Sequence, residues 1–260
     1  MKDKIVLFIP AYNCEKQIVR VLGQLTPAIM KFIDEVIVVN NRSTDNTEEA
    51  VLSFIGEHGE LPVKLLRNKE NYGLGGSHKV AFAYAKDNGF DYVIVLHGDD
   101  QGDLSDFLPV LTGRYYRKHD CILGARFMRG SKLCGYSLFR TFGNVVYNLL
   151  FAAVIGKRVY DLGSGLNMYS VKMLSNNFYE KFPDNLMFNY LMIPASEYYG
   201  TDIKFFPISW REDDQVSNVK MVSQATKVLS MLWDYYKDPE VITDEYRDVI
   251  RDKYEAEIIK

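Results

Sequence analysis

The sequence predicts an α/β fold in which helices flank a Rossmann-like, mostly parallel sheet. Over the first 125 residues, short β-rich runs alternate with longer stretches of helical periodicity, the pattern of a parallel sheet covered by helices. Polar or small residues follow the apolar runs, and such loops gather at the carboxyl edge of a parallel sheet. The 260 residues suit one large domain with an appendage.

Apolar runs identify the strands of this first half. They are short and rich in valine, isoleucine and leucine, which favours buried strands. The expected strands are Lys4–Ile9, Glu35–Val39, Val63–Leu66, Tyr92–Leu96 and Cys121–Leu123.

Helical patterns separate these strands. Glu15–Leu25 places apolar residues three and four positions apart, and Thr44–Phe54 opens with polar residues suited to a helix cap. A further helix is expected to start near His78, after a turn rich in glycine.

The pattern changes after about residue 126. Thr141–Gly156 runs for 16 residues without a charge, whereas a spanning helix needs roughly 20 apolar residues. It offers water no polar face, so it is expected either in the core or sunk into a membrane surface. Val216–Tyr236 predicts an amphipathic helix, and Glu240–Lys260 a charged surface helix that packs on the domain or on a second subunit, as in a homodimer.

Bulk properties exclude some classes of protein. Lys and Arg total 31 against 34 Asp and Glu, a formal net charge of −3. A chain without an excess of positive charge is not expected to bind nucleic acid. Cys14, Cys121 and Cys134 lack CxxC spacing, which fits a reducing compartment. The first residues hold too short an apolar run for a signal peptide. We therefore expect a cytoplasmic protein, free or peripheral on the cytoplasmic face of the membrane.

The stretch from His97 to Asp103 carries the strongest chemical signal. Three carboxylates follow the apolar run Tyr92–Leu96 directly, where folding alone does not need them. Clustered oxygen ligands at a strand end are suited to a metal-bound, phosphate-bearing ligand. The alternative is a solvated acidic loop.

Two further loops are ambiguous by themselves. Asn71–Ser77 places glycines before a helix, where backbone groups approach a ligand closely, but it equally fits a plain turn. Asn40–Asp45 fits a helix cap as well as hydrogen bonds to a nucleobase and ribose.

Taken in order, these segments resemble the family 2 glycosyltransferases, and within them the dolichyl- or polyprenyl-phosphate sugar synthase-like branch. The resemblance covers roughly residues 4–220, and only the joint spacing is specific. The matching segments are Pro10–Asn13 (PAYN), Val39–Thr47 (VNNRSTDNT), Asn71–Gly75, His97–Asp103 (HGDDQGD), Gly124–Arg126, Arg140–Asn148, Asp161–Asn167 and Pro207–Asn218.

This resemblance implies a GT-A fold, a donor sugar linked to UDP or GDP, and a divalent cation, Mg²⁺ or Mn²⁺. The variant motif implies a metal site of His97, Asp99 and Gln101. The implied donor-binding residues are Pro10, Ala11, Tyr12, Asn13, Glu15, Asn41, Asp45, Asn71, Gly75, Gly98 and Asp99.

The second half is expected to supply the acceptor side. Arginine binds phosphate through paired hydrogen bonds, which favours Arg126, Arg140 and Arg211 as phosphate-binding residues, with Ser164 and Lys220 beside them. Catalysis is assigned to Asp99, Arg126 and Arg211. Asp100 is treated as the variable position inside the motif.

The predicted function is inverting transfer of a sugar from a nucleotide-diphosphate sugar to a polyprenyl-phosphate-type acceptor at the cytoplasmic membrane surface, for glycan or cell-envelope biosynthesis. Such an acceptor is already ionised and needs no general base. One alternative acceptor is a saccharide hydroxyl of an envelope polysaccharide, whose proton would go to Asp161, Glu197 or Asp213. The other alternative is a non-catalytic nucleotide-binding homologue, because His97 and Asn40–Asn41 replace the family's usual aspartates.

The expected domain organisation follows these roles. Residues 1–220 form the glycosyltransferase domain, with residues 1–125 as the donor half and residues 126–220 as the acceptor half. Residues 221–260 form a helical extension.

Overall fold

The computed structural model describes residues 2–212 and 221–260 and has the predicted α/β architecture. Its central sheet has eight strands in the order β10-β3-β2-β1-β4-β7-β5-β8. Their bounds are β1 (Ile5–Ala11), β2 (Glu35–Asn40), β3 (Val63–Asn68), β4 (Tyr92–Leu96), β5 (Cys121–Ala125), β7 (Leu166–Ser170), β8 (Ile203–Pro207) and β10 (Ala256–Ile258). A small second sheet pairs β6 (Lys132–Cys134) with β9 (Ser209–Arg211).

The sheet is parallel over most of its width. β1 pairs in parallel with β2 and β4, β2 with β3, and β5 with β8. β7 runs antiparallel between β4 and β5, and β10 is antiparallel to β3 at the edge. All five predicted strands are present, so the apolar runs identified the first half of the sheet correctly.

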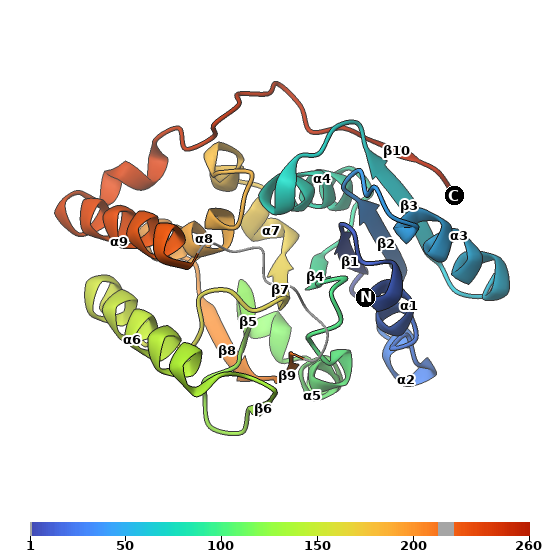
Figure 1. Ribbon diagram of the computed structural model, residues 1–260, viewed down its shortest axis with the longest axis horizontal. Helices are drawn as coiled ribbons and strands as arrows, with labels where there is room; N and C mark the ends of the chain where they lie inside the picture. Colours follow the sequence, from blue (N-terminus) through green and yellow to red (C-terminus); the bar gives the residue numbers. More distant parts are fainter. Residues whose placement is uncertain (1, 213–220) are drawn as a thin grey trace.

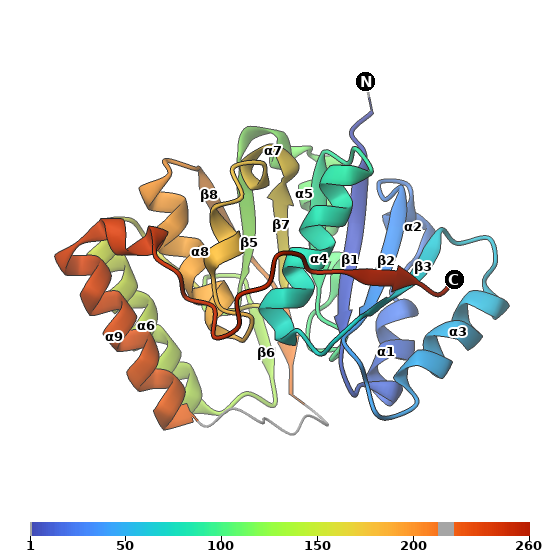
Figure 2. The same cartoon turned by 90° about the horizontal axis from the view of Figure 1, so that it is seen from above.

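Helices cover both faces of this sheet (Figures 1 and 2). Successive residues of β1 alternate between two apolar cores, since Val6 belongs to one and Leu7 to the other, as the period of a strand requires. One face carries α1 (Glu15–Leu22), α2 (Pro27–Met30), α3 (Thr47–Glu57) and α5 (Leu108–Thr112). The other carries α4 (Gly73–Asp87), α7 (Val171–Leu174) and α8 (Met187–Tyr198). Single 3-10 turns complete the chain: η1 (Leu104–Phe107), η2 (Tyr115–Lys118), η3 (Phe178–Lys181) and η4 (Pro239–Thr243).

Two long helices, α6 (Leu138–Ile155) and α9 (Met221–Lys237), lie side by side beyond β8 (Figures 1 and 2). α6 corresponds to the predicted uncharged helix, and α9 to the predicted amphipathic one, whose first residues lie outside the described part. By length and composition, α6 suffices to cross a membrane, and 11% of it is buried.

The predicted helix over residues 240–260 is wrong. The structure has η4 there, then extended chain that crosses the molecule and ends in β10 (Figure 1). The helical spacing of Tyr246, Ile250 and Tyr254 is overridden because the edge of β3 offers backbone partners: Ile259 N donates to Leu65 O at 2.8 Å. Ile250 stays 69% exposed.

Candidate functional site

The loops after β1 and β2 are joined at the carboxyl edge of the sheet. Asn13 adopts a positive φ of 49°, and its Oδ1 accepts a hydrogen bond from Thr44 N at 2.8 Å. Asp45 Oδ2 accepts from Glu15 N at 3.1 Å, while its Oδ1 accepts from Thr47 N at 3.1 Å. The structure therefore brings the predicted donor residues Asn13, Glu15 and Asp45 together, and Tyr12 beside them is 50% exposed.

Asn41 connects the end of β2 to the loop after β3. Its buried side chain accepts hydrogen bonds at Oδ1 from Asn68 Nδ2 at 2.9 Å and from Tyr72 N at 2.8 Å. Its Nδ2 donates to Asn71 Oδ1 at 2.8 Å. The neighbouring Asn40 donates from Nδ2 to Glu48 Oε2 at 2.7 Å. Both asparagines are thus held in fixed orientations.

The two predicted donor-binding glycines allow close packing of the chain on itself. A Cβ on Gly75 would lie 2.3 Å from Pro183 O, and one on Gly98 would lie 2.8 Å from Pro10 O. Gly98 N also donates to Pro10 O at 3.1 Å, which joins the end of β4 to β1. The glycines at these positions are therefore explained by packing, whatever ligand lies nearby.

His97 and Asp99 follow β4 and are both partly buried. Burial, with help from Arg126, lowers the pKa of His97 to about 4, so its ring is neutral at pH 7. Burial raises the pKa of Asp99 to about 6, and the charge of Asp100 acts in the same direction. Gln101 N donates to Asp99 Oδ1 at 3.3 Å. A carboxylate in such a place favours a nearby cation.

His97 packs against the loop before β7. A Cβ on Gly165 would lie 2.6 Å from His97 Cγ, and His97 N donates to Gly165 O at 2.9 Å. Its buried Nε2 has no hydrogen-bond partner among the described residues. The ring therefore fills a space that only glycine leaves open.

Asp100 has a structural role that the sequence interpretation missed. Its carboxylate is 2% exposed and pairs with Arg20 Nε at 2.5 Å and with Arg211 Nη2. Gln24 Nε2 donates to it at 3.2 Å, and Arg211 Nε donates to its carbonyl oxygen at 2.7 Å. Arg20 and Arg211 lie 80 and 111 positions away in the chain, so no local sequence pattern predicts these contacts.

Arg126 forms a buried, paired contact with Asp161. Its Nε and Nη2 donate to Asp161 Oδ2 and Oδ1 at 2.7 and 2.8 Å, and its backbone N donates to Oδ2 at 2.8 Å. Gly163 N donates to Oδ1 at 3.1 Å. Asp161 thus accepts four hydrogen bonds, which leaves it poorly placed to take a proton from a substrate.

The predicted phosphate-binding arginines gather around two aromatic rings. Arg126 lies 5.0 Å from the ring centre of Trp210 and 5.9 Å from that of Tyr136, and Arg140 lies 4.8 Å from Tyr136. Arg211 follows Trp210 in β9. Each arginine already has a carboxylate partner, which for Arg140 is Glu212 at 2.5 Å.

The other predicted residues are less informative. Ser164 is buried, and its Oγ donates to Asn167 Oδ1 at 3.2 Å. Asp103 caps η1 by accepting from Ser105 N at 2.9 Å. Lys220 and Asp213 lie outside the described residues.

The described residues contain no cluster of three or more His, Cys, Asp or Glu side chains suited to a metal ion. Mg²⁺ sites often use only one or two carboxylates and complete their coordination with substrate phosphates. Asp99, with the Gln101 amide two positions on, fits a site of that kind.

A hollow of about 410 Å³ lies elsewhere, where β4 begins and β7 ends. It is lined by charged side chains that include Asp91, Arg117 and Lys172. Because it faces the edge opposite to the His97–Asp103 loop, it is separate from the candidate site.

Comparisons with known proteins agree with this architecture. Residues 6–178 match the model of the glycosyl transferase family 2. The chain is 26% identical over 185 residues to the UDP-N-acetylglucosamine–dolichyl-phosphate N-acetylglucosaminyltransferase of Methanococcus voltae, which covers 67% of this chain and 72% of that protein. It is also 26% identical over 168 residues to the undecaprenyl-phosphate 4-deoxy-4-formamido-L-arabinose transferase of Serratia proteamaculans, covering 64% of this chain and 48% of that protein.

Solved structures give the same fold. Glucosyl-3-phosphoglycerate synthase from Mycobacterium tuberculosis, in complex with Mn²⁺, UDP and phosphoglyceric acid, superposes with a TM-score of 0.64 at 16% identity. The superposition covers 98% of this chain and 86% of that one. Because the family match extends over well more than half of the chain, this protein belongs to the glycosyl transferase family 2 and is a glycosyltransferase with the GT-A fold.

Proposed function

We propose that this protein transfers a sugar, with inversion, from a nucleotide-diphosphate sugar to a polyprenyl-phosphate-type acceptor at the cytoplasmic surface of a membrane. The main support for a lipid acceptor is the exposed apolar surface of α6. Leu138, Phe139, Phe142 and Leu149 of this helix are 64% to 86% exposed. Exposed apolar surface of this extent is typical of an interaction site.

The position of α6 in the fold favours lying on a membrane over crossing one. The chain enters α6 from the region of β5 and leaves it towards β7, and these two strands pair directly. A helix that spanned the bilayer would place paired strands on opposite sides. Arg140, Lys157 and Arg158 flank the apolar stretch and suit the level of anionic head groups.

The candidates for a general base also favour a lipid phosphate over a saccharide hydroxyl. Asp161 is occupied by Arg126, and Glu197 is paired with Lys157 at 2.5 Å. A phosphate acceptor needs no proton removed, so positioning by the arginines suffices. We assign this positioning, and stabilisation of the departing nucleoside diphosphate, to Arg126 and Arg211, with Arg140 and Ser164 on the acceptor side.

The donor is assigned to the carboxyl ends of β1, β2 and β4, where open α/β sheets bind nucleotides. We place a divalent cation, Mg²⁺ or Mn²⁺, at Asp99 and Gln101; when bound, it neutralises charge on the leaving diphosphate. The ring of His97 packs against Gly165, and its Nε2 is buried, so His97 is the weakest of the three predicted ligands. The relatives named for a UDP sugar and for dolichyl or undecaprenyl phosphate support this assignment.

A panel of UDP- and GDP-linked sugars, scored by thermal shift with and without Mn²⁺, tests the donor site. We expect one nucleotide class to raise the melting temperature in a Mn²⁺-dependent way, and Asp99→Asn to remove the Mn²⁺-dependent part. An unchanged shift in Asp99→Asn would contradict the metal assignment.

Turnover identifies the acceptor. Release of nucleoside diphosphate that requires a short polyprenyl phosphate supports the proposal. Turnover only with a saccharide favours the hydroxyl acceptor, and donor binding without any turnover favours a non-catalytic nucleotide-binding protein.

A further inference from the structure

Residues 244–260, here called the strap, run back across the molecule from η4 to the edge of the sheet (Figures 1 and 2). We propose that the strap sets the orientation of Asn40 and Asn41 at the end of β2, with Glu257 and Tyr254 as positioning residues for the donor nucleoside. This inference rests on the proposed function, from which it takes the nucleotide-sugar donor as the ligand.

The first connection runs from Glu257 to Asn40. Glu257 lies in β10 opposite Arg67 of β3, and its Oε1 accepts hydrogen bonds from Arg67 Nε at 2.8 Å. Arg67 Nη1 contacts Glu48 Oε1 at 3.1 Å. The other oxygen of Glu48 accepts from Asn40 Nδ2 at 2.7 Å. One carboxylate of the strap thus connects to Asn40 through two charged side chains.

The second connection runs from Tyr254 to Asn41. The rings of Tyr254 and Tyr72 meet edge to face at 5.3 Å, and Arg251 lies 5.2 Å from the centre of the Tyr72 ring. The backbone N of Tyr72 donates to Asn41 Oδ1 at 2.8 Å. The strap therefore packs on the residue whose amide fixes Asn41.

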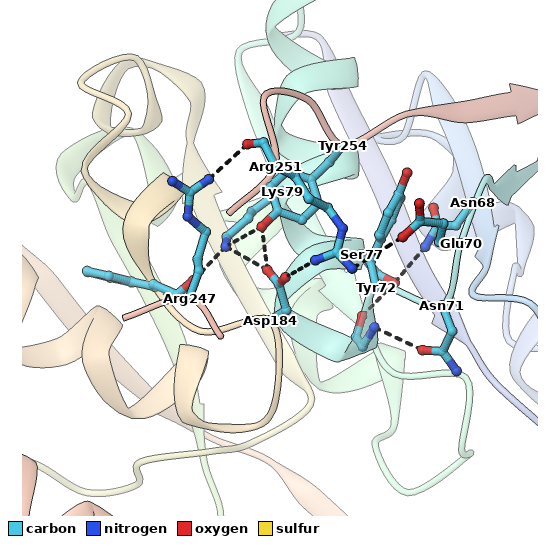
Figure 3. Close-up of polar contacts among 12 residues, drawn as sticks. Asn68, Glu70, Asn71, Tyr72, Ser77, Lys79, Asp184, Arg247, Arg251 and Tyr254 are labelled. Carbon is cyan, nitrogen blue, oxygen red and sulfur yellow. Dashed lines mark hydrogen bonds and ion pairs between the residues drawn. The ribbon is translucent and has the colours of Figure 1, made fainter. Parts of the chain in front are cut away.

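A polar cluster fixes the strap at this point (Figure 3). Asp184 Oδ1 accepts hydrogen bonds from Lys79 Nζ and from Tyr254 Oη, both at 2.7 Å, and its Oδ2 accepts from Arg251 Nη1 at 2.8 Å. Lys79 is 3% exposed, and burial lowers its pKa. The carboxylate of Asp184 compensates the charge of this buried lysine, so removing either partner would leave an unpaired buried charge.

The same cluster holds the turn that carries Asn71. Asp184 O accepts from Gly75 N at 2.8 Å, and a Cβ on Gly73 would lie 2.4 Å from that oxygen. Asn71 in turn accepts from Asn41 Nδ2. Separate contacts of the strap therefore converge on the two asparagines that replace the family's usual aspartates, at the sheet edge where nucleotides bind.

Two strap glutamates provide a matched test. Glu255 and Glu257 are both 51% exposed and both pair with a cation of the β3 edge at 2.6 Å. The partner of Glu255 is Lys69, whose Nζ reaches no other carboxylate in the described ranges. Glu255→Gln therefore removes the same charge and a similar ion pair without touching the connection to Asn40.

We expect Glu257→Gln to raise the KM for the donor sugar about threefold, as the loss of a half-exposed ion pair allows. The kcat and the KM for the acceptor should stay unchanged, and Glu255→Gln should leave all three unchanged. Tyr254→Ala should raise the donor KM about tenfold, since it removes the ring from Tyr72 as well as the hydroxyl. Tyr254→Phe, which keeps the ring, should recover most of that loss.

Hydrogen exchange of the full chain without nucleotide provides a second readout. Residues 40–48 should exchange faster in Glu257→Gln than in the wild type or in Glu255→Gln. Equal exchange and equal donor KM in the two glutamate variants would overturn the proposal and reduce the strap to a stabilising edge strand. If the wild type turned over no nucleotide sugar, the proposed function would fail, while the exchange comparison would still decide whether the strap orients this loop.

Discussion

Asp100 holds two arginines that come from distant parts of the chain. Its carboxylate is buried, whereas the side chains of Arg20 and Arg211 are 45% and 44% exposed. If the carboxylate is lost, both guanidinium groups can be solvated, so the loss of stability is smaller than for a fully buried ion pair. Asp100 also has a positive φ of 61°, which asparagine tolerates better than alanine.

We expect Asp100→Asn to lower the free energy of unfolding by about 1–3 kcal/mol, and Asp100→Ala to lower it by about 1 kcal/mol more. Urea unfolding followed by circular dichroism measures both. The exposed Asp87 supplies the control, since Asp87→Asn should change stability by less than about 0.5 kcal/mol. A loss in Asp100→Asn no larger than in this control would show that the arginines do not depend on the carboxylate.

His78 makes stability depend on pH. Its ring lies among Phe8, Phe82 and Phe188, its Nδ1 contacts Leu74 O at 2.8 Å, and burial lowers its pKa to about 3. The unfolded chain takes up a proton below about pH 6.5, while the folded chain stays neutral until about pH 3. Its contribution to stability is therefore lost as the pH falls through this window.

The free energy of unfolding should fall by up to about 1.4 kcal/mol per pH unit between pH 6.5 and the folded pKa because of His78. We expect His78→Leu to show a shallower decline in urea titrations at successive pH values from 7 to 4. The carboxylates and His97, whose pKa is also lowered, are present in both proteins, so the difference between the two slopes reports on His78. Parallel slopes would mean that His78 is not kept neutral by the fold.

At the scale of elements, α6 and α9 present apolar side chains to solvent. α9 buries Val228, Met231, Leu232 and Tyr235, while Leu229, Trp233 and Tyr236 form a second, exposed stripe four and three positions apart. Helical periodicity identified both helices, but it left α6 open between core and surface. The structure places α6 at the surface. Its buried residues are Asn148 and Phe151, and Asn148 Nδ2 donates to Tyr160 O at 2.7 Å.

If α6 lies on a membrane, Phe142→Glu combined with Leu149→Glu should reduce co-sedimentation with anionic vesicles at least about tenfold, since apolar burial drives such binding. Both side chains are more than 60% exposed, so the fold should survive. Ile250→Glu on the strap, at a residue 69% exposed, is the matched control and should leave binding intact. If the double variant sediments as well as the wild type, α6 does not bind the membrane, and the proposed lipid acceptor loses its main support.

The predicted site residues were only partly foreseeable at this scale. The loops at the strand ends were located correctly, because the strands themselves were. The partners of the charged residues were not, since Arg126 meets Asp161 and Arg211 meets Asp100 across long stretches of sequence. The assigned roles in donor, metal and acceptor binding stay predictions until the variants are measured.

Across the whole molecule, the two halves predicted for donor and acceptor share one sheet. β7, from the second half, lies between β4 and β5 of the first. The predicted boundary near residue 125 therefore does not divide the hydrogen-bonded sheet. The strap adds a further connection, because it follows the second half in the chain and pairs with β3 of the first.

One cooperative unfolding transition is expected for this reason. Fluorescence of the two tryptophans, Trp210 and Trp233, reports on the chain after residue 125, and far-ultraviolet circular dichroism reports on all elements. In urea, the two curves should coincide. Separate midpoints would show that the halves unfold independently despite the shared strand.

The α/β class, the strands of the first half and the order of the polar loops can be predicted without coordinates, because they follow from periodicity and turn chemistry within a few residues. The sequence also carried the resemblance to the family, through segments spaced along the chain. The folded chain was needed to find the partners of Asp100 and Asp161, the exposure of α6, and the extended path of residues 244–260. Each of these depends on contacts between residues far apart in the chain, and at the edge of β3 such contacts outweighed a local helical pattern.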